Sequence, residues 1–89
     1  MKIEVHSKDG CPYCEATETY LNKHGIPYTT IKHNDVEERN AKYDEWGLEG
    51  NKRTVPQIFV DGERIGGYND LVHSDVLDRF NAGNFDADF

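Results

Sequence analysis

Cysteine is scarce in this chain of 89 residues: it has two, Cys11 and Cys14, with two residues between them. The chain also lacks a run of about 18 apolar residues, the usual minimum for a membrane-spanning helix. Its N-terminal segment, MKIEVHSKDG, has neither the apolar stretch nor the cleavage pattern of a secretory signal. These absences predict no membrane association and a cytoplasmic location, where thiols are kept reduced and lasting disulfides are rare.

Basic residues are also few: ten Lys and Arg stand against seventeen Asp and Glu, for a formal net charge of −7. Nucleic acids and anionic membranes both require a basic surface, so neither is an expected partner. The simplest role of the acidic charge is to keep the protein soluble. The cations are not spread evenly, however, since Lys8 lies near the cysteines and Lys52 and Arg53 directly precede Thr54. We therefore expect a few cations to gather near one site.

Hydrophobic patterning divides the chain into strands and helices. Four segments are expected to be strands because they alternate in polarity or are rich in β-branched residues: 2–6, 28–33, 57–60 and 63–65. Three segments carry helix start signals: 12–24, 34–46 and a segment after Gly67. The last of these has an apolar stripe made of Val72, Val76, Leu77 and Phe80.

The order β-α-β-α-β-β-α is typical of an α/β protein. A β-α-β unit makes two strands parallel, and the Asp61-Gly62 hairpin turn adds antiparallel strands. We therefore expect a four-stranded mixed sheet with helices on both faces. The length allows one domain, which we place at residues 1–81. Residues 82–89 show no periodicity and are expected to form a flexible tail.

The spacing of the two cysteines points to redox chemistry. Cys11 falls at the start of the first expected helix, where free N–H groups and the helix dipole favour a thiolate. Such positions lower a cysteine pKa from about 8.5 to roughly 3.5–7.5, and the charge of Lys8 acts in the same direction. Cys14 lies one turn further in and is expected to be a less exposed, ordinary thiol. One sulfur that attacks and another that resolves are what thiol–disulfide exchange requires.

Two other uses of the cysteines are less favoured by the sequence. A structural zinc ion needs four ligands, and the histidines show no ligand spacing with this single pair: His6, His24, His33 and His73. A structural disulfide across so short a loop removes little chain entropy, and a reducing compartment opposes it. No metal is therefore expected.

Several motifs taken together resemble a glutaredoxin, a thioredoxin-fold, glutathione-dependent oxidoreductase. They are CPYC at 11–14, TVPQIFVDGERIGG at 54–67 and YNDL at 68–71. The resemblance covers about residues 2–80 and includes the order of the elements. Thioredoxins typically carry CGPC instead, and the cluster-binding monothiol glutaredoxins typically carry CGFS. The chain departs from the family's common GG-x-D-D pattern at Asn69, which replaces an acidic residue.

The resemblance implies a role for each cysteine and for the loop that faces them. Cys11 is the expected nucleophile and Cys14 the expected resolving thiol. Pro56 is expected to follow a cis peptide bond, so that the backbone of Val55 is exposed beside the cysteines and pairs with a bound peptide like an added strand. Thr54 is expected to support this loop.

The resemblance also implies a binding site for glutathione. Backbone N–H groups of Tyr68 and Asn69 are expected to hold the γ-glutamyl carboxylate, and Lys8 and Arg53 are expected to face the glycyl carboxylate. The full expected set is Lys8, Tyr13, Arg53, Thr54, Val55, Pro56, Gly67, Tyr68, Asn69 and Asp70. Because Asn69 lacks a charge, recognition of the glutathione ammonium group is expected to be weaker.

Plainer interpretations of the same residues stay open at this point. Asp70 is also suited to be only a helix cap, and Gly66-Gly67 to be only a turn. Lys8, Lys52 and Arg53 also fit an ordinary solvated surface.

The activity implied by the resemblance is reduction of protein disulfides and glutathione mixed disulfides. Glutathione is the expected co-substrate, with no prosthetic group, and the expected partners are disulfide-containing or glutathionylated proteins. Ribonucleotide reductase is a client implied only at the level of the resemblance, and we expect a monomer. One alternative is a glutaredoxin-like redoxin reduced by thioredoxin reductase. A second is an iron–sulfur cluster module, which Pro12 and Tyr13 disfavour because they stiffen and fill the space of a bridging cluster.

Overall fold

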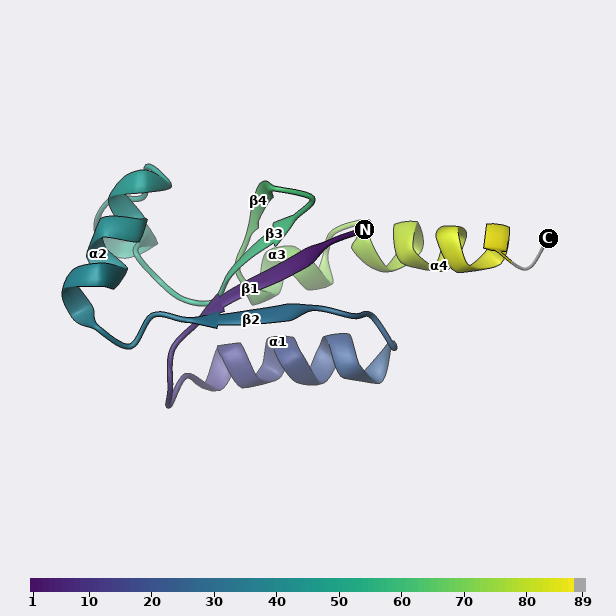
Figure 1. Cartoon of the computed structure of the whole chain (residues 1–89), viewed down its shortest axis with the longest axis horizontal. Helices are drawn as coiled ribbons and strands as arrows, with labels where there is room; N and C mark the ends of the chain where they lie inside the picture. Colours follow the sequence, from purple (N-terminus) through teal and green to yellow (C-terminus); the bar gives the residue numbers. More distant parts are fainter. Residues whose placement is uncertain (88–89) are drawn as a thin grey trace.

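The computed structural model describes residues 1–87, which form one mixed sheet and its helices (Figure 1). The sheet has four strands in the order β2-β1-β3-β4. The strands are β1 (Ile3–Ser7), β2 (Thr29–Lys32), β3 (Gln57–Val60) and β4 (Glu63–Gly66). The helices are α1 (Pro12–Lys23), α2 (Val36–Glu45), α3 (Tyr68–Val72) and α4 (Val76–Ala87), with a 3₁₀ turn η1 at Gly50–Lys52. Strand β1 pairs parallel to β2 and antiparallel to β3, which pairs antiparallel to β4. The expected mixed sheet is confirmed.

The two faces of the sheet have different chemistry because side chains alternate along β1. Ile3 and Val5 are buried in the apolar core together with Leu21 of α1, and α1 and α3 pack against each other on this side. His6 points to the opposite face, where its ring packs edge-on against Trp46, the C-terminal cap of α2. Helices therefore cover both faces, as expected.

Local sequence signals fix the ends of these elements. Pro12 is the first residue of α1, and Gly25 ends the helix with a positive φ of 67°. Asp35 caps α2, because its side chain accepts a hydrogen bond of 2.9 Å from the backbone N–H of Glu38. In the β3–β4 hairpin, Asp61 and Gly62 both have positive φ, as a two-residue turn of this kind requires.

The C-terminal region differs from expectation in two respects. The third expected helix is two helices, because the hydroxyl of Ser74 donates to the carbonyl of Leu71 and accepts from the N–H of Val76. These bonds end α3 and begin α4 by competing with the helical pattern. In addition, α4 continues to Ala87, so residues 82–87 are helical where we expected no regular structure. Residues 88 and 89 of the expected tail lie outside the described residues.

Helix α4 extends away from the sheet in Figure 1. The part of a helix that extends beyond the core needs no apolar stripe. The lack of hydrophobic periodicity in residues 82–87 is therefore compatible with a helix there. None of the helices within residues 1–87 has the length and apolar character needed to cross a bilayer.

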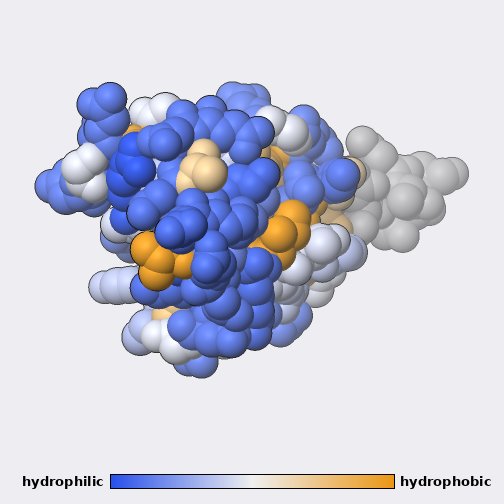
Figure 2. Space-filling model, turned by 60° about the vertical axis from the view of Figure 1, so that its left-hand side comes forward, coloured by the Kyte–Doolittle hydropathy of each residue, from blue (hydrophilic) through white to orange (hydrophobic). Residues whose placement is uncertain are grey.

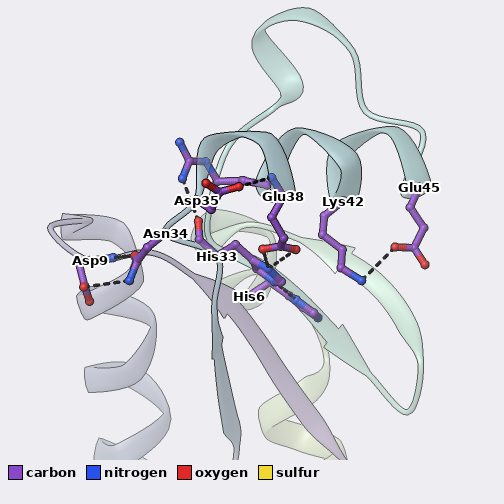
Figure 3. A network of polar contacts seen from close by, with 9 residues as sticks. His6, Asp9, His33, Asn34, Asp35, Glu38, Lys42 and Glu45 are labelled. Atoms are coloured by element: carbon purple, nitrogen blue, oxygen red, sulfur yellow. Dashed lines mark hydrogen bonds and ion pairs between the residues drawn. The ribbon is translucent and has the colours of Figure 1, made fainter.

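A hydrogen-bonded chain of side chains ties α2 to the sheet (Figure 3). His6 Nδ1 lies 2.7 Å from His33 Nε2, and His33 Nδ1 lies 2.6 Å from a carboxylate oxygen of Glu38. A carboxylate only accepts, so His33 Nδ1 carries a hydrogen. In a neutral His33 ring Nε2 then accepts from His6 Nδ1. The side chain of Arg39 donates to the carbonyl of His33 at 2.8 Å, which adds a second link between α2 and the end of β2.

The hydrogen bonds that link His6, His33 and Glu38 make the free energy of unfolding depend on pH. Burial, followed by the neighbouring His33 ring and Lys42, lowers the pKa of His6 below its ordinary 6.5, against the opposing effects of Glu4 and Glu38. The unfolded chain therefore binds a proton at His6 more readily than the folded protein does, so stability is present above about pH 6.5 and is lost as the pH falls below it. We expect the urea midpoint of the wild type to fall between about pH 7.5 and about pH 5.5.

The His6→Asn variant tests this source of the pH dependence. Its amide nitrogen replaces the Nδ1 donor but does not titrate, so the fall in urea midpoint over the same pH range is expected to be smaller. His73→Gln, at an exposed position in the turn after α3, is the matched control and is expected to keep the wild-type fall. An equal fall in His6→Asn and wild type would contradict the prediction.

Candidate functional site

Three loops meet at one end of the sheet because of how the strands pair. The end of β1 lies beside the start of β3, with His6 opposite Gln57. The end of β4 lies beside the same part of β3, with Gly66 opposite Ile58. The cysteine loop after β1, the segment before β3 and the turn after β4 are therefore neighbours, although they are far apart in the sequence.

The two cysteines lie at the N-terminal end of α1, beside the place where these three loops meet. Cys11 is the N-cap of α1 and Cys14 lies one turn inside the helix, and the structure has a disulfide between them. The backbone N–H of Cys14 donates to Cys11 Sγ at 3.2 Å, and the same sulfur lies 3.5 Å from the carbonyl oxygen of Val55. Cys11 is 6% exposed and Cys14 2%, which is the order that we expected. The peptide bond between Val55 and Pro56 is cis, also as expected.

A groove of about 660 Å³, here called the main groove, opens beside the Thr54–Pro56 segment. It brings together most of the residues expected to bind the tripeptide: Tyr13, Thr54, Val55, Pro56, Gly67, Tyr68, Asn69 and Asp70. Tyr13 is 62% exposed, and its ring lies 6.2 Å from that of Tyr68, which joins the start of α1 to α3 across the groove.

The remaining two expected residues lie in a smaller hollow of about 350 Å³, here called the second pocket. Lys8 and Arg53 line it together with Thr54 and Val55, which also line the main groove. Arg53 forms an ion pair with Asp44, and its guanidinium carbon lies 5.8 Å from the centre of the Tyr43 ring. The two hollows therefore share one short backbone segment, Thr54–Val55, that contacts Cys11.

Asp70 and Gly66 form the wall of the main groove at the start of α3. A carboxylate oxygen of Asp70 accepts from the N–H of Gly67 at 2.9 Å, so Asp70 does act as a helix cap. Gly66 has a φ of 119°, and a Cβ on it would lie 2.2 Å from that Asp70 oxygen. Gly66 is thus required by both its backbone and its neighbour, and it is more than a turn residue.

The sequence did not reveal several residues that line the two hollows. In the main groove they are Leu48, Gln57, Arg64 and Ile65, together with Lys52, which we expected only as a nearby cation. In the second pocket they are Arg39, Asn40 and Tyr43. One signal was available: Gln57 is a polar residue in an otherwise apolar strand, and it is only 4% exposed. Among residues 1–87, no cluster of three or more His, Cys, Asp or Glu is placed to hold a metal ion.

Comparisons with known proteins agree on one family. The glutaredoxin family model matches residues 3–65. Glutaredoxin 3 of Escherichia coli K12 is 33% identical over 74 residues, which are 83% of this chain and 86% of that protein.

Solved structures give the same result. Glutaredoxin 1 from Francisella tularensis, complexed with cacodylate, superposes with a TM-score of 0.75 and 31% identity, covering 90% of this chain and 96% of the other. A buckwheat glutaredoxin–glutathione complex superposes with a TM-score of 0.65 and 28% identity over 79% of this chain and 64% of the other. The thioredoxin-like fold expected from the sequence is confirmed.

The contact between Gly66 and Asp70 predicts that Gly66→Ala is destabilising. The substitution forces an unfavourable positive φ and displaces the Asp70 cap, for an expected loss of about 2–4 kcal/mol in the free energy of unfolding. Gly67→Ala is the matched control, because a Cβ there would lie 3.5 Å from the carbonyl oxygen of Pro56, an ordinary contact, and φ is not positive. We expect Gly67→Ala to cost less than about 1 kcal/mol. Urea unfolding measures the free energy of unfolding of both variants. Equal losses in the two would refute the requirement for glycine at position 66.

Proposed function

This chain belongs to the glutaredoxin family and is a thiol–disulfide oxidoreductase, and on that premise we propose that glutathione is its reductant. The observation that supports this best is the position of the Cys11–Cys14 pair against Val55, a residue shared by the main groove and the second pocket. A tripeptide that lies across Val55 has one carboxylate on each side, and each hollow offers groups that suit an anion.

The reaction with a glutathione mixed disulfide uses Cys11 alone. In the reduced protein the Cys11 thiolate attacks the glutathione sulfur, a bond forms between them, and the substrate leaves as a thiolate that takes up a proton. A second glutathione thiolate then attacks the glutathione sulfur of this adduct. The products are glutathione disulfide and the Cys11 thiolate. The substrate sulfur is reduced, the sulfur of the second glutathione is oxidised, and the glutathione that started on the substrate stays in a disulfide throughout.

The reaction with a protein disulfide uses both cysteines. Cys11 attacks one substrate sulfur and forms a mixed disulfide, and the thiolate of Cys14 then attacks Cys11. This step releases the substrate with both sulfurs reduced and leaves the Cys11–Cys14 disulfide. Two glutathione molecules reduce that bond and leave as glutathione disulfide. Neither route needs a prosthetic group.

The site's backbone supports the same proposal. The N–H of Cys14 already points at Cys11 Sγ, and the N-terminal end of α1 favours negative charge on that sulfur. We expect the backbone of Val55 to pair with the cysteinyl backbone of glutathione. We assign the γ-glutamyl carboxylate to the N–H groups of Tyr68 and Asn69. We assign the glycyl carboxylate to Lys8 and, as a second cation that keeps its ion pair with Asp44, to Arg53.

The cellular setting follows from the same proposal. We place the protein in the cytoplasm as a monomer that serves disulfide-containing and glutathionylated proteins, with ribonucleotide reductase as a candidate client.

The two cysteines are expected to separate the two routes. Cys14→Ser retains most of the reduction of a glutathione mixed disulfide and loses the reduction of a protein disulfide, because it removes only the resolving thiol. Cys11→Ser loses both by at least about a thousandfold. Both activities are followed through glutathione reductase and NADPH consumption. Substantial activity in Cys11→Ser would refute the assigned roles.

The choice of reductant is tested with the same wild-type protein. Turnover with glutathione and glutathione reductase is compared with turnover with thioredoxin reductase alone. We expect the first to support reduction of a mixed disulfide and the second to support little. The reverse result would identify the chain as a redoxin reduced by thioredoxin reductase and would remove glutathione from the site.

Asn69 provides a test of where the glutathione amino group binds. Asn69→Asp restores a negative charge beside the expected ammonium position, so the KM for glutathione is expected to fall about two- to fivefold with little change in kcat. Asn81→Asp adds the same charge at an exposed position on α4 and is expected to leave the KM unchanged. A KM that rises or does not move in Asn69→Asp would place the amino group elsewhere.

A further inference from the structure

Positive charge gathers at the redox site although the chain as a whole is acidic. Half of the ten basic side chains line the two hollows, but among residues 1–82, whose side chains the structure describes, Asp70 is the only acidic residue that does. That carboxylate is engaged by the N–H of Gly67. The basic side chains are Lys8, Arg39, Lys52, Arg53 and Arg64.

These five cations are not equally available to a ligand. Arg53 is paired with Asp44, and Arg39 donates to the carbonyl of His33. Lys8 lies in the second pocket, where the proposed function already assigns it. Lys52 and Arg64 line the main groove, are exposed, and form no ion pair with the side chains of residues 1–82, which are the ones the structure describes. Neither an ion pair of the fold nor the proposed tripeptide gives these two cations a carboxylate partner.

Arg64 is held in place by contacts that lead to the redox loop. Its Nη1 donates to Oε1 of Gln57 at 3.1 Å, and Nε2 of the same buried side chain donates to the carbonyl of Thr54 at 2.9 Å. Thr54 is the neighbour of Val55, whose carbonyl oxygen lies 3.5 Å from Cys11 Sγ. The guanidinium has five N–H donors, so several are left to bind a carboxylate. Lys52 ends η1, directly before the same loop.

We propose that Lys52 and Arg64 recognise a carboxylate in the protein partner, so that the main groove favours substrates with acidic residues next to their reactive cysteine. This inference rests on the proposed function, because it names the class of protein disulfide that the same site accepts. The occupant is an acidic segment of the partner, and charge complementarity is the reason for that choice. The acidic remainder of the surface repels such a segment elsewhere and so directs it to the groove.

One face of the molecule is mainly polar. On the face shown in Figure 2, hydrophilic residues dominate and the apolar residues form small separate patches. No broad apolar surface on that face is available to hold a partner. We therefore expect Lys52 and Arg64 to make acidic peptides bind more tightly than neutral ones, and we expect this difference to decrease as salt is added.

The test uses three cysteine peptides that are identical except for the residues on both sides of the cysteine, which are Glu, Gln or Lys. Each is supplied as its disulfide-linked dimer, and kcat/KM is measured for the wild type, Lys52→Gln/Arg64→Gln and Lys2→Gln/Lys23→Gln. The last variant removes two exposed lysines that line neither hollow, so it matches the change in net charge.

We expect the wild type to prefer the Glu peptide to the Gln peptide, and the Gln peptide to the Lys peptide. Lys52→Gln/Arg64→Gln is expected to lower kcat/KM for the Glu peptide by about three- to tenfold, so that the Glu-to-Gln ratio approaches one. The control variant keeps the wild-type ratio. Arg64→Lys in an otherwise wild-type chain is expected to keep most of the preference, because it retains the charge and loses only the contact with Gln57.

Two results would overturn this inference. One is a wild-type protein that reduces the three peptides equally. The other is a Glu-to-Gln ratio that survives in Lys52→Gln/Arg64→Gln, or one that falls equally in the control.

Fluorescence polarisation of the same peptides, with serine in place of cysteine, separates this inference from the proposed function. Preference for the Glu peptide in binding, without turnover of any disulfide, would support the acidic-partner site and refute the proposed function. Turnover without any preference in binding or rate would do the opposite.

Discussion

The antiparallel pairing of β1 with β3 is the constraint on which the site depends. It sets His6 opposite Gln57, and so it sets the loop that carries Cys11 against the loop that carries Val55. The two loops are separated by 44 residues in sequence, and neither contains the site by itself. The backbone hydrogen bonds between the two strands, together with the apolar core beneath them, therefore hold Cys11 Sγ and the carbonyl oxygen of Val55 at a fixed distance.

The two faces of β1 have different roles: one packs into the apolar core, and the other connects the sheet to α2. One face buries Ile3 and Val5 in the core, and this burial is the main source of stability in a small domain. The other face carries His6, which is linked through His33 to Glu38 of α2. Because α2 also supplies lining residues of the second pocket, the histidine chain fixes the position of that wall relative to the cysteine loop.

Much of this arrangement could be predicted from the sequence, because the decisive signals are local. Pro12, Gly25 and the Asp61-Gly62 pair each mark an end or a turn through their own backbone preferences. The parts that could not be predicted depend on distant residues. The link between Arg64 and Thr54 through Gln57 requires β3 and β4 to be paired first, and no spacing rule gives it.

The two backbone groups around Cys11 Sγ have opposite polarity, which fits the proposal that one site holds both the reactive sulfur and a bound peptide. The N–H of Cys14 is a donor, and it suits a sulfur that carries negative charge. The carbonyl of Val55 is an acceptor, which a thiolate does not need but the N–H of a bound peptide does. The N–H of Cys14 and the carbonyl of Val55 both belong to the backbone. Substituting nearby side chains can therefore change which partner is preferred while these two contacts to Cys11 Sγ stay the same. Selectivity then has to come from the surrounding side chains, and in the main groove Lys52 and Arg64, which line it without a carboxylate partner, are in a position to supply it.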